Sequence, residues 1–83
     1  MIDFSEYGNI VFHEPYKDTE YDILEFRPFG GANTRRGREN LAEMIRLLDA
    51  GLAERGQERG IVMHRSSKYP VPCCIIHPRE PEN

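Results

Sequence analysis

The histidines and cysteines are the side chains of this sequence that could do chemistry. There are three histidines, His13, His64 and His77, and two adjacent cysteines, Cys73 and Cys74. Zinc prefers imidazole and thiolate ligands, but neither a C-x-x-C nor an H-x-x-x-H spacing is present. Cys73 and His77 would lie about 13 Å apart along one strand, so an ion would need His13 or His64 from a neighbouring strand. We predict no metal site and no cofactor.

One catalytic arrangement can be drawn from these residues. His64 and either Cys73 or Cys74 could pair across a hairpin as base and nucleophile. Cysteines in an isoleucine-rich strand are usually buried and unreactive, and no third group or oxyanion loop is apparent. We therefore predict no catalytic residue and no enzyme activity, and keep a small Cys/His metal protein or enzyme as the second alternative.

Three arginines gather where the longest predicted helix begins. Arg35, Arg36 and Arg38 follow a Gly30-Gly31 turn, although a helix start usually carries acidic residues because the helix dipole is positive there. The arginines and the first free backbone N–H groups would attract an anion. This predicts an anion- or nucleic-acid-binding module as the first alternative. The competing interpretation pairs the arginines with Glu39 and the acidic residues of the N-terminal part.

Acidic residues dominate the first part of the chain. Residues 1–25 carry seven acids and one base, whereas residues 26–65 carry eight arginines and five acids. An acidic hairpin would complement a basic surface on a protein partner and speed the encounter. A solvated loop is the plain alternative. The residues predicted to contact the partner are Tyr16, Asp18, Glu20, Tyr21, Asp22, Ile23 and Glu25.

The overall composition argues against nucleic-acid and membrane roles. A formal net charge of -3 is unfavourable for neutralising phosphates, so nucleic acid is the less favoured partner. The longest apolar run has four residues, Cys73 to Ile76, far fewer than the ~20 that span a bilayer. The acidic N-terminus lacks the layout of a secretion signal, and two adjacent cysteines are typical of reduced thiols. We expect a cytoplasmic protein without membrane contact.

The periodicity of apolar residues predicts the elements that must position these side chains. Alternation predicts strands at residues 9–13, 21–29, 61–65 and 71–77, with the first two paired as a hairpin. A stripe of Leu41, Met44, Ile45, Leu48 and Leu52 predicts one helix at residues 35–55, capped by Asn33 or Thr34. The sequence therefore predicts a single α+β domain over residues 1–78. Residues 79–83 are expected to form a flexible C-terminal tail.

The predicted fold is a two-layer α+β domain. A mostly antiparallel four-stranded sheet, in the order ββαββ, would carry the amphipathic helix on one face. The other face would then expose apolar residues to a protein partner or a second copy of the chain, giving a homodimer. Its expected members are Val11, Tyr21, Ile23, Val62 and either the pair Cys74/Ile76 or the pair Cys73/Ile75.

These features together favour a small non-enzymatic protein that inhibits or regulates a larger partner. The acidic hairpin and the exposed sheet face would form the contact. In its size, its acidity and its lack of a catalytic signature, the chain is similar to small phage-encoded inhibitors of host defence, including the anti-CRISPR proteins. The acidic hairpin predicts a protein partner with a basic surface, and we expect no cofactor.

Overall fold

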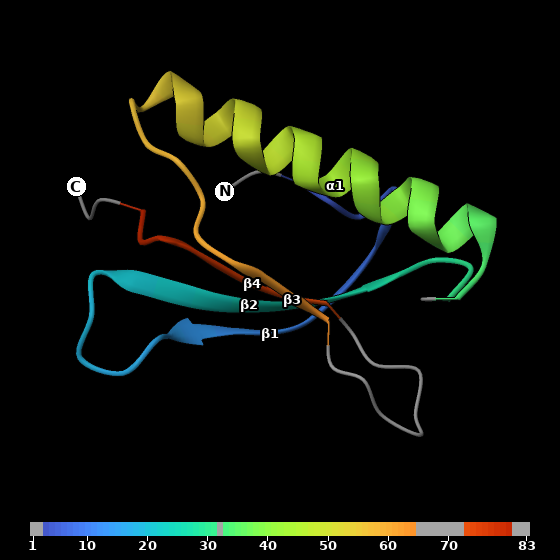
Figure 1. Cartoon of the computed structure of the whole chain (residues 1–83), viewed down its shortest axis with the longest axis horizontal. Helices are drawn as coiled ribbons and strands as arrows, with labels where there is room; N and C mark the ends of the chain where they lie inside the picture. Colours follow the sequence, from blue (N-terminus) through green and yellow to red (C-terminus); the bar gives the residue numbers. More distant parts are fainter. Residues whose placement is uncertain (1–2, 32, 65–72, 81–83) are drawn as a thin grey trace.

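A computed structural model of the chain describes residues 3–31, 33–64 and 73–80. One helix lies across one face of an antiparallel sheet, so the predicted α+β class is confirmed (Figure 1). The strand order in the sheet is β1-β2-β4-β3. Within the described ranges, no helix has the length and apolarity needed to cross a bilayer. The elements are β1 (Gly8–Pro15), β2 (Tyr21–Pro28), α1 (Arg35–Glu54), β3 (Val62–His64) and β4 (Cys73–Pro78).

The two strands after the helix differ in length. β3 has only three residues and pairs with β4 from Val62 opposite Ile75 to His64 opposite Cys73. β4 pairs along its whole length with β2, which makes β2 and β4 the two central strands. The predicted turn at residues 66–70, and the adjoining ends of the predicted strands at 65 and 71–72, lie outside the described residues.

The helix begins where a hydroxyl can cap it. The Thr34 side chain accepts a hydrogen bond from the Gly37 backbone N–H at 2.9 Å, as predicted for one of two candidate caps. Gly37 has no room for a side chain, because a Cβ there would lie 1.5 Å from the Gly31 carbonyl oxygen. This contact fixes the turn that precedes the helix against its first turn.

The predicted stripe of α1 forms the helical half of the core. Met44, Leu48 and Leu52 are buried on it, and they pack against Leu24, Phe26 and Ile75 of the sheet. Phe4 closes one end of the core, with its ring edge-on to Phe26 at a centroid distance of 6.3 Å. The core cluster therefore consists of Phe4, Leu24, Phe26, Met44, Leu48, Leu52 and Ile75.

A β-bulge changes the direction of the side chains along β1. Ile10 pairs with Phe26, but the register then shifts, and Phe12 pairs with Glu25. Val11 has no partner in this register, so Ile10 and Phe12 lie on opposite faces although they are two residues apart. The shift puts His13 opposite Leu24, on the face that carries α1.

The sheet face that turns away from α1 corrects one part of the prediction. Val62 was expected there, but it pairs with the core residue Ile75 and packs against the core. Register therefore assigns Cys74 and Ile76 to the outer face. Glu25 and Cys74 pair in register on this face and are buried, at 7% and 1% exposure, whereas Tyr21 is 42% exposed.

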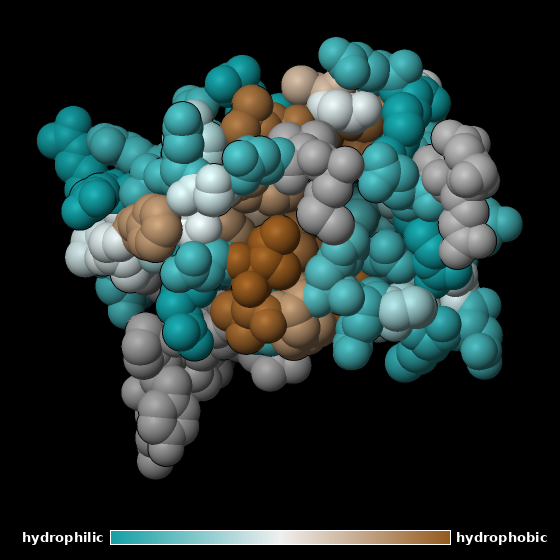
Figure 2. All heavy atoms as spheres, turned by 180° about the vertical axis from the view of Figure 1, so that it is seen from behind, coloured by the Kyte–Doolittle hydropathy of each residue, from teal (hydrophilic) through white to brown (hydrophobic). Residues whose placement is uncertain are grey.

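Apolar surface remains on the outside of the molecule. Figure 2 shows hydrophobic residues near the centre of the side seen from behind, with hydrophilic residues around them. Among the described residues, the exposed large hydrophobic side chains are Ile10, Val11, Tyr21, Phe29 and Ile61.

Candidate functional site

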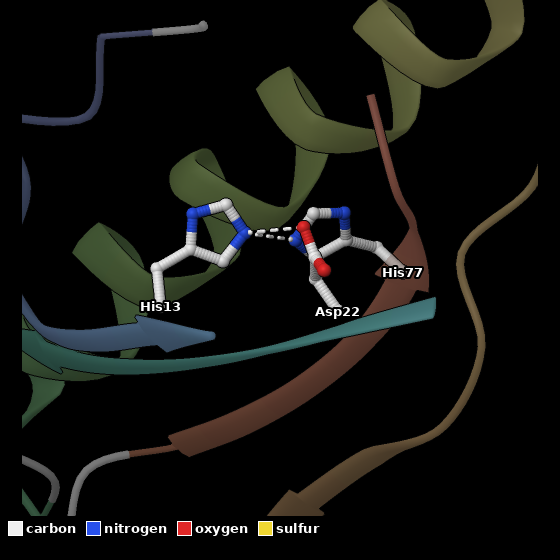
Figure 3. Close-up of side chains that lie close together, drawn as sticks. All are labelled: His13, Asp22 and His77. Carbon is white, nitrogen blue, oxygen red and sulfur yellow. Dashed lines mark hydrogen bonds and ion pairs between the residues drawn. The ribbon is translucent and has the colours of Figure 1, made fainter. Parts of the chain in front are cut away.

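Two histidines and one aspartate from three neighbouring strands converge at one end of the core. His13 comes from β1, Asp22 from β2 and His77 from β4, and all three point into the space under α1 (Figure 3). His13 Nε2 lies 3.1 Å from His77 Nε2 and 3.2 Å from Asp22 Oδ2. One ligand atom from each residue lies within 4.8 Å of the other two. We call these three residues the His–Asp–His cluster.

Register explains why these residues meet. Asp22 and His77 are directly paired across β2 and β4, and paired residues share one sheet face. His13 reaches the same face only because the bulge at Val11 has shifted it there. The cluster therefore depends on one irregularity in the edge strand.

The hydrogen bonds of the cluster define where its protons lie. His77 Nδ1 lies 2.9 Å from the carbonyl oxygen of Pro78. A carbonyl can only accept, so Nδ1 carries the proton and the Nε2 of a neutral His77 presents a lone pair. His13 Nε2 then donates toward both that lone pair and Asp22 Oδ2. Within the described residues, no buried side-chain nitrogen or oxygen lacks a partner.

Burial favours the neutral form of His77. The side chain is buried, at 8% exposure, and this burial is the main cause that lowers the pKa of His77 below its usual 6.5. The charge of Arg55 lowers the pKa of His77 as well, whereas the hydrogen bond to Pro78 and the charge of Asp22 raise it. A neutral imidazole with its Nε2 lone pair directed at its neighbours is the form that binds metals.

The lowered pKa of His77 predicts a pH-dependent stability in the metal-free protein. Below about pH 6.5 the unfolded chain takes up a proton at His77 that the folded chain resists, so unfolding becomes easier as the pH falls. The slope for one such proton is at most about 1.4 kcal/mol per pH unit. Urea unfolding at pH 7.5 and 5.5 should show this loss, and His77→Asn should reduce it. An unchanged slope in His77→Asn would contradict the assignment.

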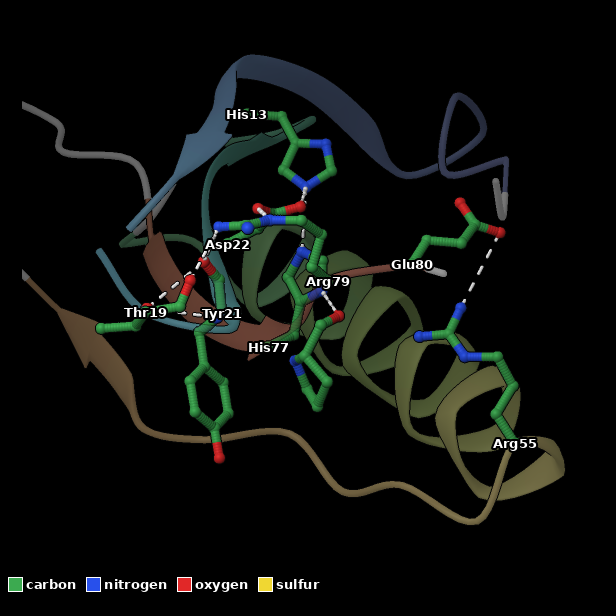
Figure 4. Close-up of polar contacts among 9 residues, drawn as sticks. His13, Thr19, Tyr21, Asp22, Arg55, His77, Arg79 and Glu80 are labelled. Carbon is green, nitrogen blue, oxygen red and sulfur yellow. Dashed lines mark hydrogen bonds and ion pairs between the residues drawn. The ribbon is translucent and has the colours of Figure 1, made fainter. Parts of the chain in front are cut away.

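Arg79 holds the carboxylate of the cluster from the other side. Its Nε donates to Asp22 Oδ1 at 2.8 Å, and its Nη2 donates to the carbonyls of Thr19 and Tyr21 at 3.1 and 2.9 Å (Figure 4). Arg79 was predicted to begin a flexible tail. Its backbone N–H instead donates to the Glu20 carbonyl at 2.9 Å, which ties this part of the chain to the β1–β2 turn. Residues 81–83 of the predicted tail lie outside the described residues.

A small crevice opens beside the cluster. It has a volume of about 60 Å³ and lies between the sheet and the C-terminal half of α1. His13 and His77 line one part of it, whereas Leu24, Leu48 and Leu52 contribute apolar walls. The cluster is therefore accessible from a space that is mostly apolar.

The structure divides the residues that were predicted to contact a protein partner. Asp18, Glu20 and Tyr21 are exposed. Asp22 is buried at 8% exposure and its carboxylate is bound by Arg79 and His13, which corrects its expected place on an exposed hairpin. Glu25 is also buried. The two remaining members, Tyr16 and Ile23, are half-buried.

The predicted anion site lies at the opposite end of α1 from Arg55 and the crevice. Gly30 and Gly31 have positive φ values of 94° and 89°, which glycine adopts without strain. Arg35 pairs with Glu39 at 3.0 Å, as the competing interpretation expected. Arg38 donates to the Asn33 carbonyl at 3.2 Å, and Arg36 is exposed.

The cysteines lie on a different part of β4. His64 and Cys73 are paired in register, and Cys73 is four positions along β4 from His77. Cys74 is buried and faces away from the cluster, because it is paired with Glu25. The sequence interpretation considered His13 and His77 together with the cysteines as metal ligands and did not include Asp22. The spacing of Asp22 two residues before the apolar Leu24 could have indicated that both side chains lie on the same face of β2.

Comparisons with known proteins return no relative for this chain: no family model, no curated protein and no solved structure matches it.

Proposed function

We propose that this chain binds one divalent transition-metal ion, of the zinc type, through His13, Asp22 and His77. The observation that carries the proposal is the convergence of two imidazole nitrogens and one carboxylate oxygen from three strands. Three protein ligands and an open fourth position are typical of zinc sites that bind a further small molecule. The carboxylate and imidazole atoms favour zinc, cobalt or nickel over magnesium and calcium, which prefer oxygen ligands.

The distances within the cluster fit one ion. Ligands that bind the same ion at about 2.0–2.1 Å are separated by about 2.8–3.0 Å in octahedral geometry and by about 3.3–3.4 Å in tetrahedral geometry. The separations of His13 Nε2 from His77 Nε2 and from Asp22 Oδ2 are 3.1 and 3.2 Å. An ion would replace the proton that His13 Nε2 now shares with its two neighbours.

The surroundings of the cluster support metal binding as well. His77 Nδ1 donates to a backbone carbonyl and Asp22 Oδ1 accepts from Arg79. Such outer partners commonly fix the orientation of metal ligands. The lowered pKa of His77 reduces competition from protons, because a metal binds only the neutral imidazole.

Titration of the metal-free protein with ZnCl2, in the presence of excess Mg²⁺, tests the proposal by calorimetry and thermal unfolding. We expect one Zn²⁺ per chain and a stabilisation of about 2.7 kcal/mol at a free concentration 100 times the Kd. Co²⁺ should bind without a thiolate charge-transfer band, because no cysteine belongs to the cluster. Absence of both heat and stabilisation would leave the cluster as a hydrogen-bonded clamp between strands.

A second candidate is the binding of a basic protein surface by the acidic hairpin, in the manner of phage-encoded inhibitors of host defence. The observation that favours it is the exposure of Asp18, Glu20 and Tyr21, since neither acid makes an ion pair within the described residues. Cross-strand register also leaves Ile23 on the outer face beside Tyr21.

Charge reversal at the hairpin tests this second candidate. Asp18→Lys combined with Glu20→Lys should abolish capture of a basic partner from a host lysate while leaving Zn²⁺ binding intact. Glu39→Lys combined with Glu43→Lys makes the same charge change on α1 and should retain the partner. Equal capture by both double variants would remove the hairpin from the contact.

A further inference from the structure

We propose that the crevice beside the His–Asp–His cluster binds a small carboxylate with a short apolar chain, its anionic head at the metal ion and its chain between the sheet and α1. This inference rests on the proposed metal site and adds the ligand class that the site accepts.

The position of the crevice links it to the cluster. His13 and His77 both line it, so it borders the two imidazoles from which an ion would be held. Three protein ligands leave at least one coordination position for a water molecule or another ligand. The crevice is the space from which such a ligand reaches the ion.

The size and walls of the crevice select a short apolar chain. A volume of about 60 Å³ holds about four water-sized groups, enough for a chain of two or three carbon atoms whose carboxylate lies at the ion. Phe4, Leu48 and Leu52 line it, and each is at most 5% exposed, so these walls belong to the packed core. An inorganic anion would leave these walls uncovered.

Charge at the mouth favours an anion over a neutral ligand. Arg55 lines the crevice, and Gln57 accepts a hydrogen bond from its Nε at 3.0 Å. Glu80 lies 3.7 Å from Arg55 Nη1 (Figure 4). His77 of the cluster lines the same crevice. With an ion bound, the positive charges of the ion, Arg55 and Arg79 exceed the negative charges of Asp22 and Glu80, so the site attracts an anion.

The Co²⁺-loaded protein tests the inference, because a ligand that enters the coordination sphere changes the visible spectrum of cobalt. Formate, acetate, propionate, butyrate and butyramide are titrated separately. We expect affinity to increase about fourfold for each methylene that is buried. We expect butyramide to produce little change.

Two variants locate the binding. Gly51→Leu adds bulk to the crevice wall and should remove the preference for butyrate over formate while leaving the Kd for Co²⁺ unchanged. Arg55→Gln should weaken butyrate binding about tenfold, measured on protein that is saturated with Co²⁺.

The outcomes separate this inference from the metal proposal. If Co²⁺ binds but no carboxylate alters its spectrum, the crevice is not a ligand site and the metal proposal stands. Equal affinity for formate and butyrate, unaffected by Gly51→Leu, would show that anions reach the ion without the crevice and would overturn the inference. If Co²⁺ itself does not bind, the metal proposal and the inference fall together.

Discussion

His77→Asn is expected to weaken Zn²⁺ binding by more than about 100-fold, because removing a direct ligand should exceed the 10- to 100-fold loss usual for an outer partner. Asparagine can still donate a hydrogen bond toward the Pro78 carbonyl, as His77 Nδ1 does, but it has no nitrogen lone pair at the position of Nε2. The change therefore removes a ligand while it retains the local backbone contact. Competition with a fluorescent zinc chelator gives the ratio of Kd values.

Two further variants decide whether the loss belongs to the cluster. His13→Gln should cause a similar loss, because its amide reaches the position of Nε2 without an imidazole lone pair. His64→Asn removes a histidine of β3 that is paired with Cys73, and Cys73 is four positions along β4 from His77. This variant should leave the Kd for Zn²⁺ unchanged. A loss in His64→Asn as large as in His77→Asn would move the metal site toward the cysteines.

The parts of the fold that follow from regular periodicity were predictable. The stripe that includes Met44, Leu48 and Leu52 predicted the helix and its buried face. Alternation in β2 puts Leu24 and Phe26 on the core face and Glu25 on the other face. These predictions required only that the apolar residues of each helix or strand follow its regular periodicity, because the apolar face is then the one that becomes buried.

The cluster was not predictable by the same reasoning, because it depends on a break in the repeat. Strict alternation along β1 keeps Ile10 and Phe12 on one face and sends His13 to the other. The bulge at Val11 reverses this, and neither glycine nor proline marks it in the sequence. Asp22 was assigned to an exposed acidic group by composition, whereas its pairing with His77 depends on a long-range register.

The contacts of Arg79, at the start of the expected tail, were not predictable for a related reason. The sequence after His77 contains two prolines and charged residues, which is typical of a frayed terminus. What holds Arg79 is its reach to Asp22 and to two carbonyls of the β1–β2 turn. Such contacts depend on which strands are neighbours, and the central pairing of β2 with β4 was not evident from local pattern.

Arg79→Met is the second change with a large expected effect, and it acts on stability and metal binding together. Methionine retains much of the side-chain length but leaves the Asp22 carboxylate, 12% exposed, without its cation. We expect a loss of about 2–3 kcal/mol in the free energy of unfolding, below the range for a fully buried pair because the Arg79 side chain is 38% exposed. Zn²⁺ affinity should fall 10- to 100-fold, since the carboxylate loses its fixed orientation.

A double-mutant cycle separates the ion pair from the hydrogen bonds that Arg79 makes to the turn. Asp22→Asn removes the charge that Arg79 neutralises and leaves the carbonyls of Thr19 and Tyr21 in place. If the ion pair between Asp22 and Arg79 carries most of the stabilisation, the double variant should lose less free energy of unfolding than the two single variants lose together. The difference should be about 0.5–3 kcal/mol, the usual range for residues in contact. Additive losses, measured by urea unfolding at pH 7.5, would show that Arg79 acts through the turn alone. In that case the metal ligand Asp22 would be oriented by the strand pairing of β2 with β4 and not by the guanidinium.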